Sequence, residues 1–129
     1  MTELTPASRA DFLSRFYELA DSVVRRVELK YTPGRRLTVV LSAQDSLAPD
    51  GWSNVRFLIS DVKEFQLREG KSTCEVISYA FLIEWFDGAI VLDFSPETEH
   101  PGGMEEIRRS DFYVAGKQAF WEVGPYSEE

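Results

Sequence analysis

The pair Asp87-Gly88, set between two runs of apolar residues, constrains the fold of this chain more than any other feature. Asp-Gly favours a two-residue β-turn, because both central residues of that turn need positive φ. Such a turn pairs, on one face of a hairpin, Trp85 with Ile90, Ile83 with Leu92, and Phe81 with Phe94. All six side chains are apolar, so the turn and the hydrophobic pattern agree. We expect a hairpin over residues 81–94 that lies centrally in a sheet, since its other face is mostly apolar too.

A helical period precedes this hairpin, near the start of the chain. Apolar side chains recur at three- and four-residue spacing from Phe12 to Val23, with charged residues between them. Thr5-Pro6 is a suitable helix start, and Ser8 offers a competing N-cap further on. We therefore predict an amphipathic helix over residues 6–22 that packs one face on the sheet.

Beyond residue 26 the pattern has the period of two that is typical of strands. Residues 27–31 and 37–41 alternate in this way around residues 32–36, which form a turn sequence with proline and glycine. Pairing the apolar positions of the two runs sets Thr32 opposite Arg36, which leaves a connection of three residues. We expect the first antiparallel hairpin here.

The remaining pattern completes a sheet. Between the runs at 55–59 and 65–67, Asp61-Val62-Lys63 breaks the alternation, so we expect a bulge or a short turn near Ser60-Asp61 that restores the inward side. Other expected segments are a polar loop at 43–53 that contains Trp52, a strand edge at 74–78, one helical turn within 105–110, and two last strands at 112–114 and 120–122. The predicted fold class is α+β, with one N-terminal amphipathic helix packed on a mostly antiparallel sheet of about seven or eight strands. We expect a single globular domain over residues 1–129, a usual size for one hydrophobic core.

Composition limits the possible functions. The chain has 22 Asp and Glu against 14 Lys and Arg, a net charge of −8 and a pI of about 4.7. A nucleic-acid binder needs clustered cations, so we predict no nucleic-acid partner. Because the chain has one histidine, His100, and one cysteine, Cys74, we predict no metal site, no cofactor and no disulfide. No apolar stretch reaches the ~20 residues of a membrane span and no secretory signal is visible, so we expect a cytoplasmic protein with no membrane partner.

The charge is unevenly spread along the chain. Residues 1–36 hold seven Lys and Arg and five Asp and Glu, whereas residues 37–129 hold seven and seventeen. A surface of one sign attracts a partner of the other sign and speeds association, although the same charge also serves solubility. Trp52 is either an anchor for a partner, because Trp is frequent at interface hot spots, or a cap on the edge of the core. The residues that we expect to contact a basic protein partner are Trp52, Glu97, Glu99, Glu105, Glu106 and Asp111.

One carboxylate pair has a geometric argument for catalysis. In the hairpin register, Glu84 and Asp93 become diagonal neighbours on one face, about 7–8 Å apart at the backbone. Apolar neighbours would raise a carboxyl pKa, as a general acid requires, and the separation fits a small hydrolase of the glycosidase type. The alternative is a pair that faces solvent or binds an arginine. Because no nucleophile, metalloprotease or nucleotide-binding motif occurs, we predict no catalytic residue and no enzyme.

Several strand-and-turn strings resemble those of small acidic bacterial domains. They are Trp52, the run Val62-Lys63-Glu64-Phe65-Gln66-Leu67, the run from Phe81 to Gly88, and Leu92-Asp93-Phe94. Some of these domains are similar to the immunity proteins of polymorphic toxin systems, and the resemblance spans roughly residues 50–123. It implies a non-enzymatic acidic domain that binds a basic toxin domain. The alternative function is a structural or adaptor domain that acts as a homo-oligomer, for instance a homodimer formed by exposed edge strands.

Overall fold

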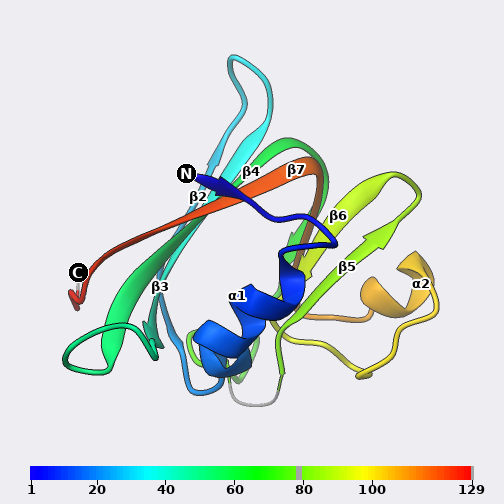
Figure 1. The fold of residues 1–129 in the computed structure, drawn as a ribbon. Coiled ribbons are helices and arrows are strands. Elements are labelled where there is room, and N and C mark those ends of the chain that lie inside the picture. Colours follow the sequence, from blue (N-terminus) through cyan, green and yellow to red (C-terminus); the bar gives the residue numbers. More distant parts are fainter. Residues whose placement is uncertain (78–79, 129) are drawn as a thin grey trace.

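The computed structural model describes residues 1–77 and 80–128 of the chain (Figure 1). In this part of the chain, seven antiparallel strands form one sheet in the order β2-β3-β4-β7-β6-β5, with β1 paired to β7. The predicted α+β class, with an N-terminal helix and a mostly antiparallel sheet, is confirmed. The elements are β1 (Thr2–Glu3), α1 (Arg9–Arg15), the 3-10 helix η1 (Tyr17–Leu19), β2 (Val23–Lys30), β3 (Arg36–Gln44), β4 (Trp52–Leu67), β5 (Leu82–Phe86), β6 (Ala89–Asp93), α2 (Met104–Ile107) and β7 (Phe112–Pro125).

The N-terminal helix is shorter than the predicted span of 6–22. α1 begins after Ser8 and its last residue is Arg15, but the Ser8 side chain makes no capping hydrogen bond. The N–H of Ser8 instead donates to Oγ1 of Thr5 (3.2 Å), so the capping side chain belongs to Thr5, the first of the two possible caps. Residues Tyr17–Leu19 then have φ between 52° and 58°, which a right-handed helix cannot include. This left-handed turn directs the chain into β2. The predicted apolar face is nevertheless buried, with Phe12, Phe16 and Leu19 each at most 2% exposed.

β2 and β3 form the first hairpin, with a longer connection than predicted. Lys30 pairs with Arg36, so the connection has five residues and the expected pairing of Thr32 with Arg36 is wrong. The carbonyl oxygen of Arg35 accepts a hydrogen bond from the N–H of Val62 (2.9 Å) in the neighbouring strand β4. Arg35, just outside the hairpin ladder, is therefore held against β4.

β4 and β7 are each one long strand where the sequence predicted two. The phase break in β4 is a β-bulge beside Asp61, whose φ is 48°, and the register with β7 shifts after Val62. The bulge is therefore the correct alternative, and the short turn is wrong. A Cβ on Gly116 of β7 would stand 2.5 Å from Ile59 Cγ2 and 2.7 Å from the next carbonyl oxygen of β4. The two strands approach so closely here that only glycine fits.

Trp52 belongs to a strand and not to the polar loop predicted at 43–53. β3 continues to Gln44, which pairs with Trp52, so the loop covers residues 45–51. β7 likewise continues to Pro125, which pairs with the residue after Trp52. Beyond it, the carbonyl oxygen of Ser127 accepts hydrogen bonds from two side chains of β3 and β4. The start of β4 and the end of β7 thus lie side by side next to Trp52.

β5 and β6 form the hairpin expected from the sequence. Asp87 and Gly88 have φ of 54° and 76°, as a two-residue turn requires. The register is the predicted one, with Trp85 paired to Ile90 and Ile83 to Leu92. Phe81 and Phe94 lie just beyond the ladder and meet through their rings, whose centroids are 5.1 Å apart. The predicted central position is wrong, because β6 pairs with β7 and β5 forms one end of the sheet.

Apolar side chains form two cores on opposite faces of the sheet. The α1 core lies between α1 and the sheet (Figure 1), and Phe16 and Phe57 are among its largest buried side chains. The α2 core lies on the other face of β6 and β7, where Ile107 of α2 packs with Val91 and Tyr113. The outer face of the β5–β6 hairpin is therefore apolar because α2 covers it, and not because the hairpin is central.

Candidate protein-binding surfaces

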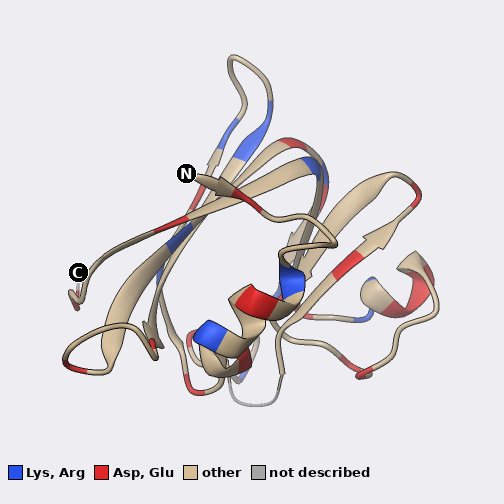
Figure 2. Ribbon diagram, viewed as in Figure 1, with Lys and Arg blue, Asp and Glu red and all other residues tan. Residues whose placement is uncertain are grey.

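The acidic residues selected from the sequence lie on one excursion of the chain between β6 and β7. We call residues 94–111 the acidic excursion; it contains α2 and carries five Asp and Glu. Figure 2 shows acidic positions on α2, on the loop before it and at the tip of the β5–β6 hairpin, all on the same side of the molecule. The fold thus brings four predicted site residues into one region: Glu97, Glu99, Glu105 and Glu106.

A buried carboxylate, Asp93, holds the two ends of the acidic excursion together. Its Oδ1 accepts hydrogen bonds from the N–H of Ser95 (3.1 Å), where the excursion leaves β6, and from Oγ of Ser110 (2.6 Å), where it returns to β7. The N–H of Phe94 also donates to the carbonyl oxygen of Phe112 (2.9 Å). We call these three bonds the Asp93 clasp. They fix the base of the excursion to the sheet.

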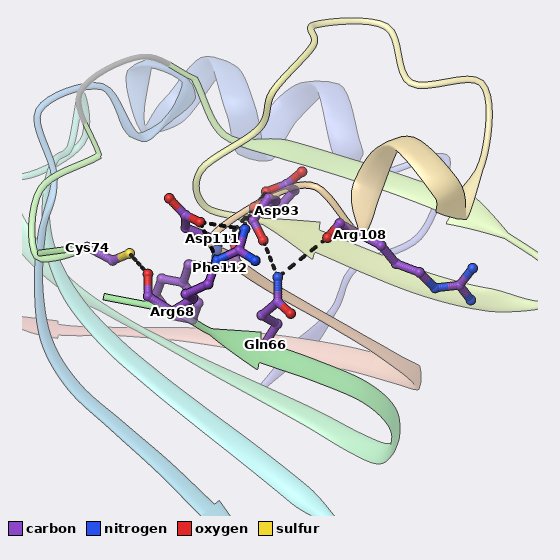
Figure 3. Close-up of polar contacts among 8 residues, drawn as sticks. Gln66, Arg68, Cys74, Asp93, Arg108, Asp111 and Phe112 are labelled. Carbon is purple, nitrogen blue, oxygen red and sulfur yellow. Dashed lines mark hydrogen bonds and ion pairs between the residues drawn. The ribbon is translucent and has the colours of Figure 1, made fainter. Parts of the chain in front are cut away.

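The surroundings of Asp93 raise its pKa to about 6. Burial is the main cause and the charge of Glu97 adds to it, while the hydrogen bonds from Ser110 and Ser95 oppose the rise. Gln66 of β4 supports the clasp from the other side: its Nε2 donates to the carbonyl oxygen of Ser110 (2.7 Å) and to that of Arg108 (3.4 Å; Figure 3). The excursion is therefore anchored through a carboxyl group whose pKa is about 6.

Glu84, the other member of the carboxylate pair considered for catalysis, has a different partner. In the β5–β6 ladder Glu84 pairs with Val91 and Asp93 with Leu82, so the two are diagonal neighbours, as expected. Oε2 of Glu84 lies 3.3 Å from a guanidinium nitrogen of Arg9 on α1. The binding of an arginine is the alternative that the sequence left open for this pair. Each carboxylate is thus held by its own set of protein groups.

Two ion pairs connect the excursion to β4 and the residue after it. Asp111 pairs with Arg68, which follows β4, at 2.9 Å. Arg108 binds Glu64 through two nitrogens, at 2.7 Å and 3.1 Å, and this contact holds the pKa of Glu64 below its ordinary value. Asp111, a predicted site residue, is therefore engaged within the protein.

A cavity of about 180 Å³ lies beside the Arg68–Asp111 pair. Its lining includes Cys74, whose thiol donates to the carbonyl oxygen of Arg68 at 3.8 Å (Figure 3). Burial raises the pKa of Cys74, and the charges of Glu69 and Asp111 raise it further. Because the thiolate is the reactive form, this cysteine is a weak nucleophile. Of the strand edge predicted at 74–78, the described residues 74–77 form only an isolated bridge, between Val76 and Val23, and Ser78 lies outside the described residues.

Trp52, the sixth predicted site residue, lies apart from the acidic excursion. It is the first residue of β4, whereas the excursion returns to the sheet beside Leu67, the last residue of β4. Trp52 lines an apolar groove of about 460 Å³, and its ring meets that of Tyr126 edge-on, with the centroids 6.2 Å apart. Leu47, which also lines the groove, is 71% exposed. The structure therefore divides the predicted site into two surfaces, the acidic excursion and this Trp52 groove.

A buried ion pair fixes the loop that forms the Trp52 groove. Asp45 is 2% exposed and accepts hydrogen bonds from Nε of Arg15 (2.9 Å), from a second nitrogen of Arg15 (3.1 Å), from the N–H of Leu47 (3.0 Å) and from Oγ of Ser53 (2.8 Å). Burial alone would raise the pKa of Asp45, but these bonds hold it below its ordinary value. These bonds hold the loop that carries the apolar rim in one position.

Sequence reasoning missed the groups that hold both surfaces in shape. Asp45 carries a local signal, since an Asp side chain often accepts a hydrogen bond from the N–H two residues on, here that of Leu47. Nothing local points to Arg15, which lies 30 residues before Asp45, or to Ser110, which lies 17 residues after Asp93.

Comparison of the chain with protein-family models, with curated proteins and with solved structures finds no match. Across residues 1–77 and 80–128, no three His, Cys, Asp or Glu side chains are arranged to hold a metal ion. No helix in the same residues has the length and apolar character needed to cross a membrane. The interpretation of the two surfaces therefore depends on their own geometry and charge.

Proposed function

We propose that this protein is a non-enzymatic, acidic protein-binding domain of the immunity or inhibitor type, which engages a basic partner in the cytoplasm through the acidic excursion. The observation that carries the proposal is the local excess of acid. Residues 80–111, which include β5, β6 and the excursion, hold eight Asp and Glu against two Arg, and one of these, Arg108, is bound to Glu64. Such a surface steers a partner of opposite charge and raises the rate of association.

The anchoring of the excursion supports a binding role over solubility alone. The Asp93 clasp closes its base, and Ile107 of α2 is buried in the α2 core. A charged segment that only serves solubility does not need a fixed shape. A surface that is ordered in the free protein loses less conformational entropy when a partner binds.

The test is binding of the proteins encoded next to this chain. We expect one of them to form a one-to-one complex at low salt, with an association rate that falls as ionic strength rises. A triple variant, Glu97→Gln with Glu105→Gln and Glu106→Gln, should associate about tenfold more slowly. Its matched control, Asp11→Asn with Glu18→Gln and Glu75→Gln, removes the same charge from exposed positions elsewhere and should keep most of the rate. If no complex forms at low salt, or if the two triple variants behave alike, the proposal fails.

The Trp52 groove favours a second candidate function, a structural or adaptor domain that acts as a homodimer. The groove and the exposed Leu47 lie on one surface, so two copies related by a twofold axis can each insert Leu47 into the other copy's groove. Light scattering at high protein concentration tests this candidate. A dimer that Leu47→Asp dissociates supports it, and a monomer at every concentration contradicts it.

A further inference from the structure

The two end strands of the sheet are protected to different degrees, and β2 is the better protected. Its first half is covered by a neighbouring segment, where the N–H of Val24 donates to the carbonyl oxygen of Glu75 (2.6 Å). Its second half alternates the exposed charged residues Arg26, Glu28 and Lys30 with apolar ones. Charged side chains along an edge strand oppose pairing with another chain.

β5, at the other end, has an open backbone edge. No strand of the described chain pairs with its outer side, and it contains no proline and no bulge. In antiparallel pairing, the backbone groups of alternate residues point to opposite sides of the strand. The carbonyl oxygen of Ile83 accepts a hydrogen bond from the guanidinium of Arg9 (3.1 Å), which lies outside the sheet, so Ile83 faces outward. By the same alternation, the N–H and C=O of Trp85 face outward as well.

The side chains of β5 determine what kind of strand fits this edge. Glu84 and Phe86 lie on the face that α2 covers, and Trp85 lies on the α1 face; all three are half-buried. A strand added along β5 would place one side chain beside Glu84 and, on the same face, its alternate neighbours beside Leu82 and Phe86, next to the acidic excursion. Lys or Arg suits these positions, while apolar side chains suit the positions between them, beside Trp85.

We propose that the basic partner adds an extended segment to the open edge of β5, with Lys or Arg at alternate positions and apolar residues between them. This inference rests on the proposed function, because it names how the same partner is held. Arg9 occupies two groups that the segment needs, the carbonyl oxygen of Ile83 and the carboxylate of Glu84. On binding, a backbone N–H of the partner replaces Arg9 at Ile83, and a partner cation replaces it at Glu84.

Three single variants test the role of the edge. Arg9→Ala frees both groups and removes a charge of the same sign as the partner's, so the affinity for the basic partner should rise about fivefold. Glu84→Gln removes the carboxylate that the partner's cation would bind, so the same affinity should fall about fivefold. The matched control is Glu28→Gln, which removes the same charge from the middle of the opposite end strand and should leave the affinity unchanged. A rise in affinity on loss of an arginine would not follow from damage to the fold.

The probe is a ten-residue peptide with blocked ends in which Lys and Val alternate, and its control is a peptide in which Lys and Pro alternate. The two peptides have the same charge, but proline removes every second N–H and cannot extend a ladder. NMR measurement of amide hydrogen exchange should show the N–H of Trp85 protected about tenfold by the first peptide and not by the second.

The outcomes separate this inference from the function on which it rests. If neither peptide binds, if both bind alike, or if protection falls on β2 instead of β5, strand addition is wrong. The proposed function survives those results as long as a neighbouring gene product binds with the expected salt dependence. If that salt-dependent binding is absent, the proposed function fails, whatever the exchange rate at Trp85.

Discussion

The β2–β3 and β5–β6 hairpins lie at opposite ends of one sheet, and their regions differ in charge, in the length of the connection and in how far the outer edge is covered. Residues 23–36, which include β2 and its connection, hold five Lys and Arg and one Glu, whereas residues 80–111 hold two Arg and eight Asp and Glu. The first hairpin has a five-residue connection, and its outer edge is partly covered. The second has a two-residue turn and an open outer edge. Figure 2 shows basic positions on the β2–β3 hairpin, and acidic positions on α2 and at the tip of the β5–β6 hairpin.

This difference teaches that net charge understates the electrostatic character of the molecule. A net charge of −8 alone describes a soluble acidic protein. The sheet order places the cationic hairpin and the acidic excursion at its two ends, so the molecule has one cationic end and one acidic end. The approach of a charged molecule to such a surface depends on its orientation.

The largest expected effect concerns Gly116, the residue of β7 that lies between β4 and β6. Gly116 pairs with Val62 of β4 on one side and with Ile90 of β6 on the other. Gly116→Ala places a Cβ 2.5 Å from Ile59 Cγ2, so we expect the free energy of unfolding to fall by about 3 kcal/mol or more. Gly124→Ala is the control, because its Cβ meets nothing within 4 Å, and it should change stability by less than about 0.5 kcal/mol. Urea unfolding measures both; equal losses would show that the close approach at Gly116 is unimportant.

The next effect is a pH dependence that separates the acidic excursion from the Trp52 groove. The folded-state pKa of Asp93, about 6, lies above its ordinary value of 3.8. Its contribution to stability is therefore fully present below pH 3.8 and is lost as the pH rises through 6, by about 3 kcal/mol in total. Asp93→Asn cannot ionise, so the wild-type protein should lose stability relative to this variant between pH 4 and pH 6 in urea titrations.

Asp45 supplies the control with the opposite sign. Its pKa lies below the ordinary value, so its contribution is present above pH 3.8 and is lost as the pH falls through the folded-state pKa. Relative to Asp45→Asn, the wild-type protein should lose stability on the acid side. If the stability curves of the wild-type protein and Asp93→Asn stay parallel from pH 4 to pH 6, the burial of Asp93 has no energetic consequence and the clasp is not an ionisable anchor.

Local sequence information explains which parts of the fold were predictable. The β5–β6 register followed from Asp87-Gly88 because a turn and its flanking residues are contiguous. The position of that hairpin at the end of the sheet did not follow, since its second apolar face is covered by α2, a helix of four residues. The sequence did not predict the end of the helix, because Tyr17–Leu19 adopt positive φ although none of them is a glycine.

Contacts between distant segments explain which parts of the candidate sites were not predictable. The bulge that joins the two halves of β4 is matched by Gly116, more than fifty residues later, so the phase break looked like a strand end. Trp52 and the acidic residues were grouped because both are polar-loop features in the sequence, whereas the two ends of β4 separate them. Asp45 was overlooked because its main partner, Arg15, is on α1.

A smaller effect compares the turns of the two hairpins directly. Gly88 and Gly34 both have positive φ, 76° and 98°, in a two-residue turn and a five-residue connection respectively. Gly88→Ala should cost about 1 kcal/mol, because a two-residue turn that sets the register cannot change φ. Gly34→Ala should cost less, since four other residues share the adjustment and its Cβ would meet nothing closer than 3.7 Å. Thermal unfolding of the two variants measures the difference, and a larger loss for Gly34→Ala would mean that the longer connection is the more rigid one.

The smallest effect asks whether Asp111 belongs to the binding surface. Its ion pair with Arg68 joins two side chains that are about half exposed, and such pairs contribute less than about 1 kcal/mol. Asp111→Asn should therefore change stability by less than about 0.5 kcal/mol in urea unfolding. Because Arg68 already neutralises this carboxylate, the same variant should slow association with a basic partner less than Glu105→Gln does. An equal or greater slowing would mean that the partner displaces Arg68 and that the acidic surface extends from α2 to the end of β4.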